Sequence, residues 1–220
     1  MVKNLNSKKK SKPNPFQPRK RPTLEYEQGL KKEGFAKIAG LDEVGRGALA
    51  GPVMAAVCVL RDGRLLEEVR DSKMLSEKKR KELARVIKSR AKGWALASAS
   101  PAEIEKLGIQ KATYLAFRRA IQKLVQPIDY LLVDAYQVPQ IDIPQKALKK
   151  GDQICLSIAA ASILAKVARD ELMKKMAQKY PGYHFEENKG YGTKEHLRAL
   201  ETLGPSPIHR QNFQPVKEKK

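Results

Sequence analysis

The sequence predicts an α/β domain in which a mixed β-sheet is flanked by helices. Two patterns predict this fold class. Apolar strands come first with a tight connection, and further strands then alternate with segments of helical periodicity. Size agrees, because 220 residues suit one medium domain, with or without a tail, and can bury a sizeable core.

The expected strands are the apolar runs of the chain. The glycine-rich segment Glu43–Gly51 joins the first two, and the run that ends at Asp134 has the length of a buried strand and follows a proline. The expected strands are Ala36–Asp42, Pro52–Leu60, Trp94–Ala99, Ile128–Asp134 and Gln145–Lys149.

The expected helices are marked by capping residues and by apolar residues at helical spacing. Ser76 can cap the helix Ser76–Arg90, and Ser100-Pro101-Ala102-Glu103 has the capping-box pattern that begins a short helix. Gly204-Pro205 ends the last helix, which Thr193 can cap. The longer helices are Ile109–Val125, Ile154–Tyr180 and Thr193–Leu203.

Charge is the unusual feature of the composition. The 44 Lys and Arg residues outnumber the 24 Asp and Glu residues, for a formal net charge of +20. Such a surface favours polyanionic partners, nucleic acid first and an anionic membrane surface second. Met1–Thr23 contains six Lys, two Arg and no acidic residue, so we expect a disordered basic tail, 1–23, before a folded domain, 24–220.

The sequence also argues against several classes of protein. We expect no secretory signal, because the tail has no apolar run, and no membrane helix, because no stretch reaches roughly 18 apolar residues. Cys58 and Cys155 each lie among aliphatic residues, which predicts buried reduced thiols in a reducing compartment, the cytoplasm. Neither cysteine has a histidine at metal-ligand spacing.

Two adjacent acids stand at the end of the first predicted strand. Carboxylates such as Asp42 and Glu43 are costly there unless they are paired or bind a metal, and Mg²⁺ prefers such oxygens, shared with a substrate phosphate. Successive strand residues point to opposite faces, so both acids reach one site only if the chain turns, which the following Gly45-Arg46-Gly47 allows. The alternative is a polar hairpin loop with solvated acids.

A second apolar strand also ends on an acid. Asp134 stands at its carboxyl end, where ligands of α/β sheets tend to bind. Taken alone, Asp134 is better explained as a cap of the next turn. Two such strands in a very basic protein favour a site instead, because two-metal phosphodiester chemistry needs carboxylates from separate elements.

Two further acids are associated with the predicted helix Ile154–Tyr180. If that helix is continuous, Asp152 and Asp170 are roughly 27 Å apart, so they cannot share one metal site. Asp170 has Lys166 and Lys174 at helical spacing, so surface ion pairs explain it. Asp152 has no such neighbours, and we prefer it as the site acid.

Glycines flank a tyrosine in the segment Asn188-Lys189-Gly190-Tyr191-Gly192-Thr193. They could hold Tyr191 outward, where its ring can stack on a base or sugar, with Lys189 as a phosphate contact. Taken alone, the segment is better explained as a glycine-rich turn with Tyr191 tucked onto the domain.

Several short motifs occur in the order and at the spacings typical of one enzyme family. They are Asp42-Glu43-Val44-Gly45-Arg46-Gly47, Ala50-Gly51-Pro52-Val53, Asp71-Ser72-Lys73, Val133-Asp134, Gly151-Asp152, Ser157–Asp170 and Lys189-Gly190-Tyr191-Gly192-Thr193. From about Ile38 to Val216 the chain thus resembles the ribonuclease HII family, the type 2 ribonucleases H. The resemblance implies an RNase H-like fold with a small C-terminal helical part, about 180–220. It also implies endonucleolytic cleavage of the RNA strand of RNA–DNA hybrids and at single ribonucleotides in duplex DNA, leaving 5′-phosphate and 3′-hydroxyl ends.

The resemblance further implies roles for individual residues. The acids expected to hold Mg²⁺ or Mn²⁺, two ions during catalysis, are Asp42, Glu43, Asp134 and Asp152. The expected substrate-binding residues are Gly45, Arg46, Gly47, Asp71, Ser72, Lys73, Lys189 and Tyr191. Among them, the turn Gly45–Gly47 (the glycine turn) would contact the 2′-hydroxyl. The segment 71–73 would lie by the backbone of the nucleic acid, and Tyr191 would stack at the neighbouring deoxynucleotide. The expected partners are RNA–DNA hybrid duplex and ribonucleotide-containing DNA, bound by a monomer.

The chain departs from the family pattern at three positions: Ala48 stands where Pro is usual, Ala135 where Gly is common, and Asn188 where His is common. The first two should mainly affect turn stiffness, and the third leaves open any role of that His. One rival interpretation is a non-enzymatic basic protein that coats nucleic acid. Another is a two-metal nuclease with a similar sheet and a different substrate.

Overall fold

The computed structural model describes residues 21–61 and 76–219, so the expected contacts Asp71, Ser72 and Lys73 lie outside the described residues. The strands are β1 (Ile38–Val44), β2 (Val53–Val59), β3 (Gly93–Ala99), β4 (Tyr130–Asp134) and β5 (Gln145–Leu148). The helices are α1 (Glu25–Lys32), α2 (Glu77–Arg90), α3 (Pro101–Leu107), α4 (Ile109–Lys123), α5 (Leu156–Lys179), α6 (Phe185–Asn188) and α7 (Lys194–Leu203). Short 3-10 turns occur at Gly151–Gln153 and Val216–Lys219.

The strands form one mixed sheet in the order β3-β2-β1-β4-β5. The tight connection makes β1 and β2 antiparallel neighbours, and β3 continues that pattern. Strand β4 is parallel to its neighbour β1, and β5 is parallel to its neighbour β4. The predicted mixed α/β sheet is therefore confirmed, including the short strand expected at 145–149.

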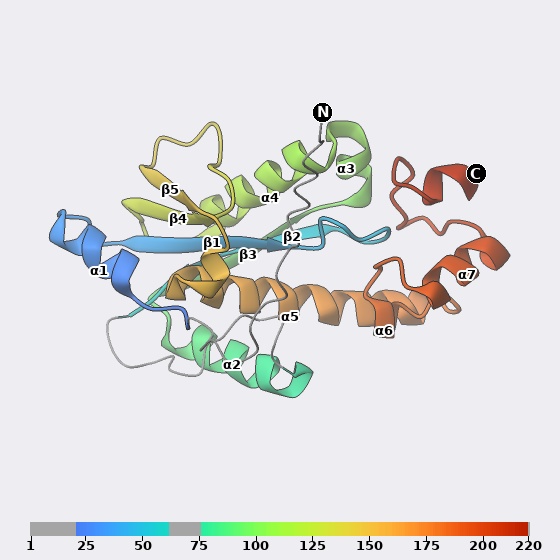
Figure 1. Ribbon diagram of the computed structural model, residues 1–220, viewed down its shortest axis with the longest axis horizontal. Helices are drawn as coiled ribbons and strands as arrows, with labels where there is room; N and C mark the ends of the chain where they lie inside the picture. The colour runs from blue at the N-terminus through green and yellow to red at the C-terminus, as the bar shows by residue number, and fades with distance from the viewer. Residues whose placement is uncertain (1–20, 62–75, 220) are drawn as a thin grey trace, which may run out of the picture.

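Helices cover both faces of the sheet (Figure 1). Helix α4 packs with the β1, β2 and β3 side chains that point to one face, around Leu41, Val57 and Phe117. Helices α5 and α2 cover the other face, where Ala56 and Cys58 of β2 meet Ile163. This two-sided burial explains why the strands are apolar runs and why the Ala-rich half of α5 has no polar face.

Helix α5 approaches the sheet very closely at Gly40 of β1. A Cβ atom at this position would lie 2.1 Å from the backbone carbon of Ser157, which no side chain can tolerate. Glycine here lets the start of α5 lie directly on β1. The contact brings α5 close to the strand that carries Asp42.

Two structural features near the N-terminus were not part of the expectation. Helix α1 was not predicted, because it is short and polar and Leu24 at its N-cap makes no side-chain capping hydrogen bond. It is held by tertiary contacts that bury Leu30. In addition, Thr23, expected in the tail, pairs with Cys155, and its N–H donates to the carbonyl of Ile154 over 3.1 Å. Thr23 therefore takes part in the described fold.

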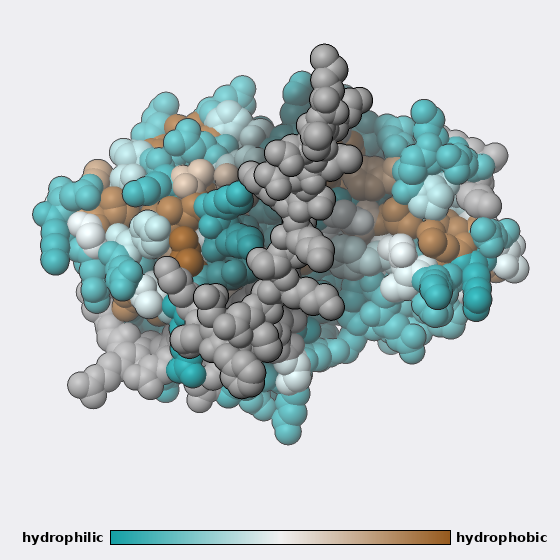
Figure 2. All heavy atoms as spheres, viewed as in Figure 1, coloured by the Kyte–Doolittle hydropathy of each residue, from teal (hydrophilic) through white to brown (hydrophobic). Residues whose placement is uncertain are grey.

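The C-terminal helices form a small unit beside the sheet, with its own apolar cluster around Phe185, Leu200 and Val216. Figure 2 shows hydrophilic side chains over most of the visible described surface, with apolar patches near α1 and near α7. Within residues 21–61 and 76–219, no helix has the length and apolar character needed to cross a membrane. Both cysteines are buried free thiols, as predicted.

Candidate active site

The two adjacent acids lie on opposite faces of β1, because the strand continues past both to Val44. Asp42 pairs with Ala56 and lies on the α5 side, where Ser162 donates a hydrogen bond to its carboxylate. Glu43 lies on the α4 side, near Arg46, with 3.6 Å between Oε1 and Nη1. The chain turns only after Val44, so the two carboxylates flank the end of the strand.

Asp134 ends β4, the parallel neighbour of β1, and is half-buried. Its Oδ1 accepts a 2.7 Å hydrogen bond from the N–H of Gly151. A Cβ on Gly151 would lie 3.4 Å from the same oxygen and 2.6 Å from a methyl of Ile158, so glycine permits this approach. The next residue, Asp152, is 6% exposed and lies in the turn before α5. The fold therefore brings the 151–152 turn to the end of β4.

Burial and mutual repulsion act on these carboxylates. Burial raises the pKa of Asp42 well above its usual value, and the charges of Glu43 and Asp134 raise it further. Burial also raises the pKa of Glu43 to about 7, with Arg46 acting against the shift and Asp134 adding to it. Asp134 thus repels both acids of β1, which places all three in one electrostatic cluster.

This cluster has the character of a partial site for a hard cation. Among residues 21–61 and 76–219, no three His, Cys, Asp or Glu side chains are arranged to hold a metal by themselves. Mg²⁺ is commonly held by one or two carboxylates together with waters and substrate phosphate, so a closed protein cage is not required. Buried carboxylates that repel each other are what such a cation would stabilise.

The turn after β1 is held in a defined shape by Arg210. Its guanidinium donates to the carbonyls of Gly45 over 2.6 Å, Arg46 over 2.8 Å and Gly51 over 3.0 Å. Arg210 is buried, and burial lowers its pKa to about 9, so it remains a cation at neutral pH. Sequence analysis missed this residue, because a lone arginine near the C-terminus has no local pattern.

Arg169 of α5 is a second buried arginine that sequence analysis missed. It donates to the carbonyls of Pro52, Lys189 and Ala50 over 3.0, 2.8 and 3.0 Å. Its guanidinium carbon lies 5.4 Å from the ring centre of Tyr191. Arg169 therefore connects the backbone just after the glycine turn (Gly45–Gly47) with the tyrosine segment (Asn188–Thr193).

The two outer positions of the glycine turn have different surroundings. Gly45 is buried with φ +94°, and a Cβ there would lie 2.2 Å from Nε of Arg169. Gly47 is exposed, and a Cβ there would meet nothing within 4 Å. Between them, Arg46 donates from Nη2 to Oε1 of Gln110 on α4 over 2.7 Å. Gly45 shapes the turn, whereas Gly47 faces open space.

The segment around Tyr191 lies against the glycine turn. The carbonyl of Gly190 accepts hydrogen bonds from Leu49 and Ala50, with N–O distances of 2.7 and 3.2 Å. Tyr191 itself is partly exposed. Nζ of Lys189 donates to the carbonyl of Glu186, so in this arrangement it is engaged by its own segment.

Of the departures from the family pattern, Asn188 has a structural explanation, and nothing in the structure explains Ala135. Asn188 is buried: its Nδ2 donates to the carbonyl of Tyr183, and its Oδ1 accepts from the N–H of Gly190, both over 2.7 Å. It thereby fixes the tyrosine segment from within. Ala135 has φ +61°, a left-handed conformation that favours glycine.

Asp170 forms the predicted pair with Lys166, at 2.7 Å between Oδ1 and Nζ. The second expected partner, Lys174, instead pairs with Glu77 of α2 at 2.6 Å. Asp170 is also 5% exposed, so it is a buried group rather than the surface ion pair that helical spacing indicated. Asp170 lies about four helical turns along α5 from its start, whereas Asp152 lies before that helix.

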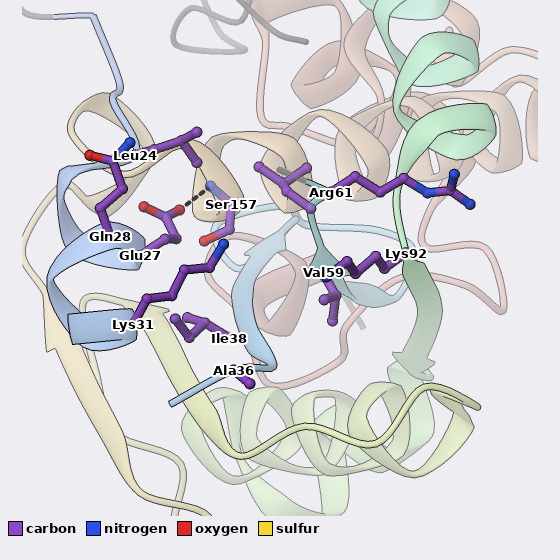
Figure 3. A pocket seen from close by; sticks show the side chains of 11 residues that line it. Leu24, Glu27, Gln28, Lys31, Ala36, Ile38, Val59, Arg61, Lys92 and Ser157 are labelled. Atoms are coloured by element: carbon purple, nitrogen blue, oxygen red, sulfur yellow. Dashed lines mark hydrogen bonds between the residues drawn. The ribbon is translucent and has the colours of Figure 1, made fainter. Parts of the chain in front are cut away.

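A separate pocket lies between α1 and the first two strands (Figure 3). Glu27 of α1 reaches across it and accepts a 2.8 Å hydrogen bond from the N–H of Ser157, which caps the start of α5. Ile38, the first residue of β1, lines the pocket. It is four residues before Asp42, or about 13 Å along a strand, so the pocket is separate from the carboxylate cluster.

Comparison with known proteins finds relatives over most of the chain. A family model described as Ribonuclease HII matches residues 39–216. Ribonuclease HII of Desulfitobacterium hafniense strain Y51 is 51% identical over 195 residues, which cover 89% of this chain and 75% of the relative.

Two solved structures share the fold. The ribonuclease H2 from Pyrococcus horikoshii OT3 has a TM-score of 0.71 at 24% identity, covering 83% of this chain and 96% of that one. Bst-RNase HIII in complex with Mn²⁺ has a TM-score of 0.64 at 19% identity, covering 83% of this chain and 68% of that one.

Proposed function

The chain belongs to the Ribonuclease HII family, whose members are endonucleases that cleave the RNA of RNA–DNA hybrids, and we propose that it does so at the carboxylate cluster formed by β1 and β4. The observation that carries this proposal is the electrostatic cluster of Asp42, Glu43 and Asp134, in which burial and, to a smaller extent, neighbouring carboxylates raise the pKa of the first two. A nucleic-acid coating protein would have no use for such a costly arrangement.

Asp42, Glu43, Asp134 and Asp152 are the residues proposed to hold Mg²⁺ or Mn²⁺, as two ions during catalysis. The bound cations would activate water and stabilise charge on the scissile phosphate. The protein supplies the geometry: Ser162 orients Asp42, and the N–H of Gly151 orients Asp134. The expected products carry 5′-phosphate and 3′-hydroxyl ends.

Recognition of ribose is assigned to the Gly45–Gly47 turn. Arg210 already donates to the carbonyls of Gly45 and Arg46. We therefore expect the N–H groups of the turn to contact the 2′-hydroxyl, which would act as the acceptor. The exposed Gly47 has open space where the sugar would approach. This proposal extends the substrates to single ribonucleotides embedded in DNA, with Tyr191 stacking on the adjacent deoxynucleotide.

The remaining contacts are electrostatic. Lys189 and the 71–73 segment are proposed to lie along the phosphate backbone. With a net charge of +20, affinity should come mainly from Lys and Arg on phosphates and should fall as salt rises. The free buried thiols of Cys58 and Cys155 suit a reducing compartment, so we propose that the protein is cytoplasmic. We also propose that it acts as a monomer.

The test uses three labelled duplexes of one sequence: an RNA–DNA hybrid, DNA with a single ribonucleotide, and DNA alone. Each is incubated with Mg²⁺, with Mn²⁺ and with EDTA. We expect cleavage of the first two in the presence of either metal, no cleavage in EDTA, and no cleavage of DNA alone. Full activity in EDTA would overturn the metal site, and equal cleavage of DNA alone would overturn the substrate assignment.

A further inference from the structure

Two buried histidines lie behind the tyrosine segment. His196 of α7 is 0% exposed, and His209, in the segment after α7, is 2% exposed. Their Nε2 atoms are 2.9 Å apart. A contact between two imidazole nitrogens requires that one donates and the other accepts, so at least one ring must be neutral.

The neighbouring groups determine the direction of this contact. Both the backbone N–H and the hydroxyl of Ser206 lie at hydrogen-bond distance from Nδ1 of His209, at 2.9 and 2.8 Å. A hydroxyl can donate or accept, but a backbone N–H can only donate, so Nδ1 of His209 carries no proton. In the neutral ring, Nε2 of His209 then carries the proton and donates to Nε2 of His196. The proton of His196 must therefore be on Nδ1, which donates to the carbonyl of Tyr191 over 2.8 Å. The result is a one-way chain from Ser206 to Tyr191.

Burial supports the neutral state of both rings. It lowers the pKa of His209 to about 4, and it lowers the pKa of His196 below its usual value. The rings are also enclosed by Tyr183 and Phe185, with His196 edge-on to Phe185 at 5.4 Å between centroids. The backbone groups of Tyr191 and Ser206 act in the opposite direction and raise the pKa of His196 and His209 respectively, but burial is the larger effect on both rings.

The chain of hydrogen bonds ends at Tyr191, and the residue next to His209 binds the glycine turn. His209 pairs with Ala50, and the next residue, Arg210, binds the carbonyls of Gly45 and Arg46. Through His196, the same dipeptide reaches the carbonyl of Tyr191. The adjacent residues His209 and Arg210 therefore connect the glycine turn with Tyr191.

We propose that His196 and His209 are positioning residues, a fixed-tautomer relay that sets Tyr191 relative to the glycine turn and thereby controls cleavage at a ribonucleotide–deoxyribonucleotide junction. This inference rests on the proposed function of that site. The relay transfers no proton to the substrate. It acts by holding the backbone carbonyl of Tyr191, on which the direction of the tyrosine side chain depends.

A direct test of the relay does not depend on activity. Long-range ¹H–¹⁵N NMR of ¹⁵N-histidine-labelled protein distinguishes the two neutral tautomers, and with only three histidines in the chain each can be assigned by substitution. At pH 7 we expect the Nδ1–H tautomer for His196 and the Nε2–H tautomer for His209. The opposite tautomers, or an imidazolium at either position, would overturn the relay even if the enzyme is active.

The functional test compares His196→Asn with His196→Ala. Asn can place its amide nitrogen near the position of Nδ1 and keep the bond to Tyr191, whereas Ala removes it. We expect His196→Ala to lower kcat/KM at a single ribonucleotide about tenfold, the lower part of the range for losing one base–aromatic stack. His196→Asn should restore most of this loss, and cleavage of a continuous hybrid should change much less in both variants.

The control is the exposed His184, at φ +55°, replaced by Asn because asparagine tolerates that conformation. All variants are compared at equal folded fraction by circular dichroism. If the Asn and Ala variants of His196 lose activity equally on both substrates, the histidines only fill space and the proposal fails. An inactive wild type with the expected tautomers would instead overturn the proposed function and leave the relay standing.

Discussion

At the scale of single residues, the main feature of the candidate site is that carboxylates which repel one another lie close together and are shielded from solvent. Asp42 is 5% exposed, and Glu43 and Asp134 both repel it. We predict that Asp42→Asn and Asp134→Asn each abolish cleavage and leave duplex binding nearly unchanged, since affinity comes from Lys and Arg. Loss of one repelling charge should also raise the metal-free melting temperature. Single-turnover cleavage, a binding titration and thermal denaturation check these points, and an active Asp134→Asn enzyme would contradict the site.

The raised pKa of Glu43 makes a prediction about pH. Its pKa is about 7 in the folded protein, against an ordinary value of 4.5, so folding favours the protonated form. That contribution to stability is complete below pH 4.5 and is lost as pH rises through 7, a change of at most about 3 kcal/mol. Without metal, the melting temperature should therefore fall from pH 5 to pH 8.

Glu43→Gln should reduce this slope, and Mg²⁺ should stabilise the wild type more at pH 8 than at pH 5, because the ligands must lose their protons to bind. The exposed Glu105→Gln is the control and should leave the slope as it is. A slope that is the same in wild type and Glu43→Gln would show that another group causes it.

Substitutions at Gly45 and Gly47 test two different roles of the glycine turn. Gly45 is needed for the conformation of the turn, and Gly47 for contact with the substrate. Gly45→Ala would clash with Arg169 at a positive φ and should destabilise the protein. Gly47→Ala meets nothing in the protein, so it should fold normally and still lower cleavage of ribonucleotide substrates about tenfold or more, by blocking the sugar. Gly29→Ala in α1, also without a contact within 4 Å, is the matched control. Full activity of Gly47→Ala would remove the turn from ribose recognition.

At the scale of elements, α5 places one acid before its start and another deep along its length. Asp152 lies beside the Gly151–Asp134 hydrogen bond, whereas Asp170 is a buried partner of Lys166. We predict that Asp152→Asn severely lowers turnover. Asp170→Asn should mainly cost stability, about 1–2 kcal/mol, more than a surface pair because the bond is buried and charge-assisted. Urea denaturation and turnover at equal folded fraction measure both, and the reverse ranking would exchange their roles.

At the scale of the whole molecule, charge governs affinity. The expected tail is basic, and Thr23 pairs with Cys155, so a clean deletion removes residues 1–20 only. We predict that this deletion weakens duplex binding and makes its salt dependence shallower. The log–log slope should fall by up to about 0.9 for each phosphate that the shortened protein no longer neutralises. Turnover at saturating substrate should hardly change. A large fall in maximal rate would place the tail in the site.

Much of this molecule followed from the sequence by itself. Apolar runs and capping residues predicted the strands and the main helices, because hydrophobic periodicity and capping are local properties of the chain. The adjacent acids and Asp134 stood at predicted strand ends, so a carboxylate cluster was foreseeable once those strands were neighbours. Helix α1 was not foreseeable, because tertiary contacts rather than its own caps hold it.

Only the tertiary structure decided how the recognition segments are held. Arg210 and Gly45 are 165 residues apart in sequence, and Arg169 and Pro52 are 117 apart. An arginine that binds backbone carbonyls leaves no periodic pattern, since its partners are groups that every residue carries. The histidine tautomers likewise depend on which neighbour donates to which nitrogen. These contacts exist only after the chain has folded, which is why the residue types alone could not reveal them.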